Sequence, residues 1–218
     1  MAVGVGALFS GAALLGNIII GLPLPLTLAS AVAVVAAGLA FLLRRATPAQ
    51  RGRMLRTVLI GAGAGILATL IYDAAKFGLS QLDPSPYNPF EATRIFGQLL
   101  IGTSSPPAAV IVAGTMFHLL NGTMFGLAYT ALFAREGRTS LRYAALSGAG
   151  WGLFLETFQL TLYPQWLGIT LVDEFVRISA LSHLVYGASL GLLARWGFRE
   201  RQRQLGPRVG QEPQGRPD

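Results

Sequence analysis

FHLLNGTMFGL at residues 117–127 and SHLVYGASLGL at residues 182–192 share the pattern His-Leu-x-x-Gly-x-x-x-Gly-Leu. Both stretches lie within long apolar runs, and they contain the two histidines of the chain, His118 and His183. On a helix, a histidine and the glycines four and eight residues later lie on one face. The pair therefore predicts two apolar helices, each with a histidine next to a stripe of glycine.

The composition indicates a membrane protein. Of 218 residues, 52% are hydrophobic and 12% are charged, whereas a soluble domain carries about 25% charged residues. A helix needs about 20 apolar residues to cross a bilayer. The sequence contains six such runs, at about residues 3–21, 24–43, 57–79, 108–134, 143–163 and 176–196. We therefore predict an all-α, polytopic membrane protein with six transmembrane helices in one domain.

The positive charges alternate with the apolar runs. Arginines gather in the polar linkers at residues 44–56 and 135–142 and in the tail at residues 195–208, whereas the loops after the third and fifth runs carry four acidic side chains against two arginines. By the positive-inside rule, both termini are then cytoplasmic. The arginines form no continuous face, so the net charge of +7 does not indicate nucleic-acid binding. Sixteen arginines against one lysine are typical of a GC-rich bacterial genome, which predicts the bacterial inner membrane as the location.

Two segments outside the six runs have their own predictions. Asn88 reads as the N-cap of a short helix, with proline at its first position and Glu91 at its third. We expect this helix, at about residues 89–102, to lie in the outer membrane interface. The tail at residues 201–218 is polar, without an apolar run, and is predicted to be disordered.

The glycine pattern suggests an internal repeat. The third and fifth runs contain Gly-Ala-Gly-x-Gly at residues 61–65 and 148–152, upstream of the two histidine stretches. Runs three/four and five/six then read as two copies of one hairpin, repeated about an axis along the membrane normal. Glycines spaced by four residues let helices approach closely; a flat ligand on the same face is the alternative. These pairs are Gly61/Gly65, Gly122/Gly126, Gly148/Gly152 and Gly187/Gly191.

Ionisable groups are costly inside a membrane and indicate function. At about 1.5 Å per residue, Asp73, Glu156 and His183 lie at a similar depth in the outer half, with His118 somewhat deeper. Glu156 has no basic partner at helical spacing, so it must pair across helices or carry a proton, because desolvation disfavours its charged form. The supporting polar residues of this layer are Lys76, Asn121, Gln159 and Tyr186.

Several functions agree with this layer. Proton or cation handling, or sensing, needs only titratable side chains around a shared cavity. Alternatively, His118 and His183 ligate a haem or another tetrapyrrole, or the layer holds a divalent metal. The remaining alternatives are that each histidine only hydrogen-bonds a neighbouring helix, that Asp73 and Lys76 only neutralise each other, and that the chain is a structural subunit of a homo-oligomer or larger membrane complex.

Enzymatic function is not indicated. The chain contains no cysteine, which excludes disulfides and thiol nucleophiles. Ser182 adjoins His183 but lies on another helix face, so it forms no catalytic triad with that histidine.

The segment Ala68-Thr69-Leu70-Ile71-Tyr72-Asp73, followed by the two His-x-x-x-Gly helices, resembles the YagU-like group of small bacterial inner-membrane proteins. The resemblance covers about residues 61–196. It implies a role linked to acid tolerance, which would suit a titratable layer. It implies no catalytic or binding residues, and it leaves the first two runs outside the shared pattern.

Overall fold

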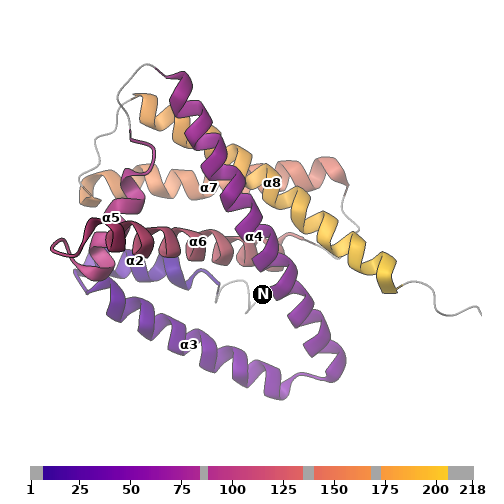
Figure 1. Cartoon of the computed structure of the whole chain (residues 1–218). Coiled ribbons are helices and arrows are strands. Elements are labelled where there is room, and N and C mark those ends of the chain that lie inside the picture. Colours follow the sequence, from indigo (N-terminus) through magenta and orange to yellow (C-terminus); the bar gives the residue numbers. More distant parts are fainter. Residues whose placement is uncertain (1–6, 84–87, 135–139, 168–172, 206–218) are drawn as a thin grey trace, which may run out of the picture.

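The computed structural model describes residues 7–83, 88–134, 140–167 and 173–205, which form helices and no strand. The all-α prediction is thus confirmed for these residues. In Figure 1, α4 and α8 run diagonally across α6 and α7. α4 packs against both α6 and α8, α7 packs against α8, and α5 packs against α6. The helices are α2 (Phe9–Ile20), α3 (Leu24–Arg45), α4 (Pro48–Leu82), α5 (Glu91–Ile101), α6 (Pro107–Leu132), α7 (Leu141–Leu167) and α8 (Asp173–Leu205).

Four of the described helices are long and apolar enough to cross a membrane: α3, α4, α6 and the Val176–Arg201 part of α8. α2 has 12 residues, fewer than the roughly 20 that a span requires. α7 has 27 residues, but its apolar run includes Glu156 and Gln159 and is not among the four. The coarse prediction of several membrane-crossing helices therefore holds, on length and composition.

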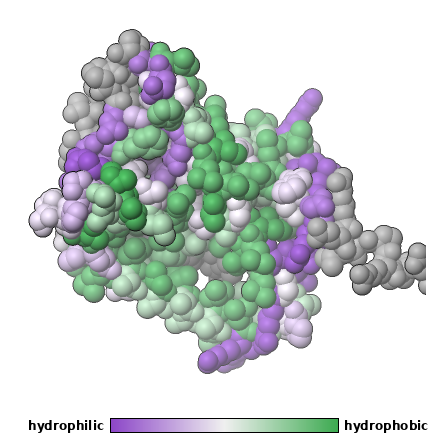
Figure 2. Space-filling model, viewed as in Figure 1, coloured by the Kyte–Doolittle hydropathy of each residue, from purple (hydrophilic) through white to green (hydrophobic). Residues whose placement is uncertain are grey.

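The surface of the molecule is strongly apolar. Hydrophobic residues cover much of the face in Figure 2, and hydrophilic residues gather at its margins. An apolar 18-residue stretch of α3 has none of its residues buried in the protein, and Val34 is 72% exposed. Soluble proteins rarely expose apolar patches of this extent. Contact with lipid chains would explain why these apolar residues are not buried within the protein.

The helices extend further than the sequence predicted. Residues 44–56 were expected to form a polar linker, but only residues 46–47 separate α3 from α4. Thr47 caps α4, since its hydroxyl accepts from the Gln50 N–H at 3.3 Å while Gln50 Oε1 accepts from the Thr47 N–H at 2.8 Å. This capping box stabilises the early start of α4. α8 likewise continues to Leu205, so the prediction of disorder is wrong for residues 201–205, and residues 206–218 lie outside the described part.

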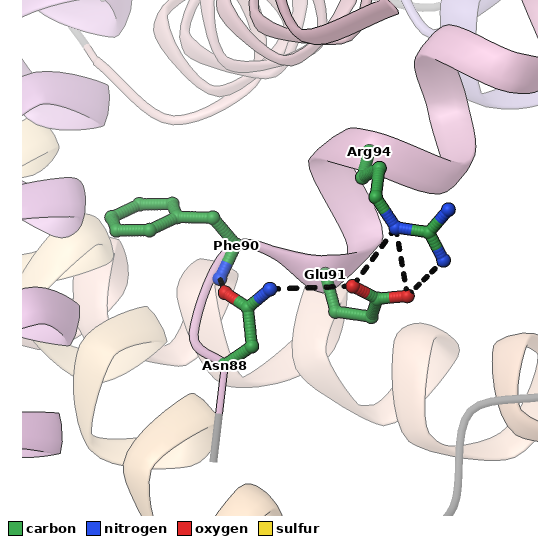
Figure 3. Close-up of polar contacts among 4 residues, drawn as sticks. All are labelled: Asn88, Phe90, Glu91 and Arg94. Atoms are coloured by element: carbon green, nitrogen blue, oxygen red, sulfur yellow. Dashed lines mark hydrogen bonds and ion pairs between the residues drawn. The ribbon is translucent and has the colours of Figure 1, made fainter. Parts of the chain in front are cut away.

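The start of α5 also differs from its prediction. Asn88 is not the N-cap: α5 begins at Glu91, and Phe90 occupies the cap position without a side-chain cap. Asn88 Oδ1 instead accepts from the Phe90 N–H at 3.0 Å, and the Asn88 amide donates to Glu91 at 3.3 Å. Glu91 is paired with Arg94 one turn later (Figure 3). The N-cap of α5 thus lies two residues later in the chain than predicted, at Phe90 instead of Asn88.

Glycines form the closest helix crossings. A Cβ on Gly65 would lie 2.6 Å from the Gly122 carbonyl oxygen, so α4 and α6 meet backbone to backbone. α7 and α8 meet in the same way, because a Cβ on Gly152 would overlap the His183 carbonyl oxygen and one on Gly148 would overlap that of Gly187. The remaining paired glycines, Gly61, Gly126 and Gly191, also face backbone atoms of the partner helix. This geometry agrees with a packing role and leaves no flat face for a ligand.

Candidate functional site

The polar residues singled out in the sequence converge on one cavity of about 70 Å³. It lies between α4, α6, α7 and α8, and the start of α5 closes one side of it. A cavity of this size and polarity has room for several water molecules. The predicted residues that line it are Asp73, Lys76, His118, Asn121, Gln159, His183 and Tyr186. Glu156 lies directly behind His183, outside the cavity lining.

Asp73 and His118 form the more exposed of two histidine–carboxylate pairs. His118 Nε2 lies 2.9 Å from Asp73 Oδ1, and the two side chains are 23% and 28% exposed, respectively. The pair joins α4 to α6 across 45 residues of sequence. The alternative in which Asp73 is neutralised by Lys76 alone is therefore incomplete, because the carboxylate has a direct partner on another helix.

His183 and Glu156 form the buried pair, since their side chains are only 6% and 3% exposed. His183 Nδ1 lies 3.0 Å from the Ser179 carbonyl oxygen, and His183 Nε2 lies 3.1 Å from Gln159 Nε2. Because the carbonyl can only accept and the amide nitrogen can only donate, this pattern assigns the imidazole proton to Nδ1. His183 thus lies between the cavity, which it lines together with Gln159, and the buried carboxyl of Glu156.

Glu156 is the least satisfied polar group of the site. Its Oε2 is only 2.7 Å from His183 Nδ1, but that N–H is directed at the Ser179 carbonyl. Neither carboxyl oxygen of Glu156 accepts a hydrogen bond of good geometry within the described residues, and Asn121 Oδ1 is in the same position. Buried acceptors without a donor are costly. The site therefore lacks hydrogen-bond donors at its deepest point.

Tyr72 connects the two pairs, although the sequence analysis did not single it out. Its ring centroid lies 5.8 Å from the His118 ring and 4.8 Å from the His183 ring. Its hydroxyl lies 3.3 Å from the ammonium of Lys76, which is itself buried. Lys76 also interacts electrostatically with Glu156 and Asp73. Only the four-residue spacing of Tyr72 and Lys76, which places them on one helix face, signalled this role in the sequence.

Contacts between the helices close the site on the side that faces the paired glycines. The buried hydroxyl of Tyr186 donates to the Gly122 carbonyl at 3.0 Å, and this carbonyl also faces Gly65 at the α4–α6 crossing. On each of the four helices, the paired glycines lie on the same side of the polar layer along the bundle. Backbone contact between helices therefore seals the bundle on that side of the layer.

α5 covers the opposite side. Phe90, Thr93 and Phe96 line the cavity, and Phe96 packs edge to face on Phe117 of α6 with ring centroids 5.4 Å apart. A Cβ on Gly114 of α6 would overlap the Thr93 carbonyl oxygen, so the two helices are in backbone contact. α5 is thus a packed cover of the site, which the sequence did not predict.

The geometry does not favour a tetrapyrrole between the histidines. The Tyr72 ring contacts both imidazoles, each Nε2 already has a side-chain partner, and the cavity is far smaller than a haem. Nor do the described residues contain a group of three or more His, Asp or Glu side chains that could hold a metal ion. The two histidine–carboxylate pairs are instead separate, and the Tyr72 ring lies between their imidazoles.

No protein-family model, no curated protein and no solved structure matches this chain, so the resemblance to the YagU-like group stays a prediction.

Proposed function

We propose that this chain is a proton-handling protein of the bacterial inner membrane, with six membrane-crossing helices and both termini in the cytoplasm. α2 and α7 complete the set of spans: α2 lies within the first predicted run, and α7 is long enough although less apolar. α4/α6 and α7/α8 are then two copies of one hairpin. The matched glycine crossings of the two pairs support this duplication.

The function rests on one observation: a fully buried Glu156, without a good hydrogen-bond donor, lies 2.7 Å from His183. A carboxylate in such a place is costly, and binding a proton removes its charge and most of that cost. This is the arrangement expected of a proton-storing site rather than of a packing contact.

The second pair supplies a route to it. Asp73 and His118 are partly exposed beside the cavity, whereas Glu156 and His183 are buried beyond it. We infer that a proton enters at the Asp73–His118 pair, crosses the cavity past Tyr72 on water, and reaches Glu156 through His183. Because the glycine crossings close the other side, the route favours uptake and release from the α5 side. Net transport would require those crossings to open.

Infrared spectroscopy of the protein in lipid nanodiscs tests the proposal. A titration from about pH 5 to about pH 9 should change a carboxylic C=O band that Glu156→Gln removes. Proton flux into liposomes containing a pH-sensitive dye should fall by at least about tenfold in the same variant, if the protein transports protons, because positioned proton-transfer groups contribute about 10²-fold or more to rate. Asp73→Asn should slow uptake while leaving the Glu156 band in place.

Glu200→Gln is the matched control, since it makes the same change on α8 at a residue that belongs neither to the cavity lining nor to the His183–Glu156 pair. It should leave both the band and the flux unchanged. A spectrum in which Glu156→Gln removes no titrating band, together with wild-type flux, would overturn the proposed function.

A further inference from the structure

A second, apolar groove adjoins the polar cavity. This groove of about 290 Å³ lies between α2, α6 and α7. Phe125, Leu155 and Gln159 line both spaces, so only these side chains lie between the groove and the cavity. Gln159 is the one polar side chain of the groove, and it is also the residue that hydrogen-bonds His183.

The groove has the shape of a site for an alkyl chain. Phe154 and Phe158 line it and are 48% and 45% exposed, so it is open toward the apolar exterior. α2 forms its other wall, where a Cβ on Gly11 would lie 3.4 Å from the Phe125 ring. A chain entering from the lipid would lie along α2 and end at Gln159.

The cavity defines the head of such a molecule. Asn121 Oδ1 lines the cavity and is a buried acceptor in need of a donor, which a hydroxyl group supplies. The carboxylate of Asp73 disfavours an anionic head, and the ammonium of Lys76 disfavours a cationic one. The small volume of the cavity favours a compact head.

We propose that the cavity and groove together bind a neutral, single-chain lipid with a compact hydroxyl-bearing head. The head lies against Asn121 in the cavity, and the chain occupies the groove along α2. This inference rests on the proposed placement of the helices in a bilayer but not on proton transfer. It gives α2, which had no assigned role, a place in the site.

Photolabelling with a monoacylglycerol that carries a diazirine in its acyl chain tests the inference. Labelled peptides should come from α2, α6 and α7 in the purified full-length protein. Ala12→Trp should lower this labelling by about tenfold, the effect of ~1.4 kcal/mol in binding, because the indole would fill the groove that Ala12 lines. Ala33→Trp, a change of equal size on the exposed surface of α3, should have no effect.

The head is tested by a second variant and a second probe. Asn121→Leu should lower labelling by about fivefold, since one net hydrogen bond contributes about 1 kcal/mol. The fatty acid and alkylamine with the same chain should label more weakly than the monoacylglycerol. Labelling that ignores Ala12→Trp would overturn the groove assignment, and stronger labelling by either charged probe would overturn the neutral head. Intact labelling without a titrating Glu156 band would refute the proton function alone.

Discussion

Replacing Gly152 by alanine should destabilise the protein, whereas the same change two residues earlier, at Gly150, should stabilise it. Both glycines lie in α7, but a Cβ on Gly152 would overlap the His183 carbonyl oxygen, and one on Gly150 would meet nothing within 4 Å. The two variants make the same chemical change in the same helix. Only their contact with α8 differs.

The magnitude follows from two opposing effects. Alanine in a helix interior is favoured over glycine by roughly 0.5–1 kcal/mol, and Gly150→Ala should gain about that amount. Gly152→Ala makes the same gain, but it must force α7 and α8 apart, and overpacking of this kind costs about 1–3 kcal/mol. In the glycine crossing the obstacle is backbone, which cannot rotate away. We therefore expect the two variants to differ by about 1–3 kcal/mol.

Unfolding in mild detergent with increasing sodium dodecyl sulfate, followed by circular dichroism, measures this difference. The other hairpin provides an independent repeat, since Gly65 faces the α6 backbone while Gly63 meets nothing within 4 Å. Gly65→Ala and Gly63→Ala should show the same opposite signs. Equal stabilities within either pair of variants would refute the conclusion that these glycines are the points of backbone contact.

The remaining predictions concern α5. Gly114→Leu should push α5 away from α6 and open the cavity. A cysteine introduced in the cavity by Thr69→Cys should then react faster with a water-soluble maleimide. Gly78→Leu is the control, because a Cβ on Gly78 would meet nothing within 4 Å, and it should leave the reaction rate unchanged. The Arg94 hydrogen bond lowers the pKa of Glu91 from its ordinary value of 4.5. The pair therefore stabilises α5 at a pH above 4.5, and this stabilisation is lost as the pH falls through the lowered pKa of Glu91. Amide exchange in α5 should differ between wild type and Glu91→Gln at pH 7, and a difference that does not shrink as the pH is lowered would contradict this.

Some of the site was predictable from the sequence. Titratable residues are rare in apolar helices because each one is expensive there, so Asp73, His118, Glu156 and His183 were recognisable without a structure. Rise per residue then placed them at similar depth. The cavity contains or adjoins all four, because depth along a helix depends only on the local sequence.

The pairing of these residues was not predictable. Which side chain meets which depends on the rotation of each helix about its own axis and on the crossing angles, and both are set by distant glycine contacts. Tyr72 between the two histidines, and Ser179 as acceptor for His183, are consequences of that rotation. The position of α5 over the cavity depends likewise on its contact with Gly114.

The sequence by itself thus determined an all-helical chain, its apolar helices, the glycine spacing of their crossings, and the identity and depth of the buried ionisable groups. These are properties of short segments. Only the tertiary structure decided that two histidine–carboxylate pairs lie beside one cavity, that Glu156 lacks a hydrogen-bond donor, and that an apolar groove along α2 adjoins the cavity. Each of these depends on atoms from three or more helices, whose relative positions no single segment specifies.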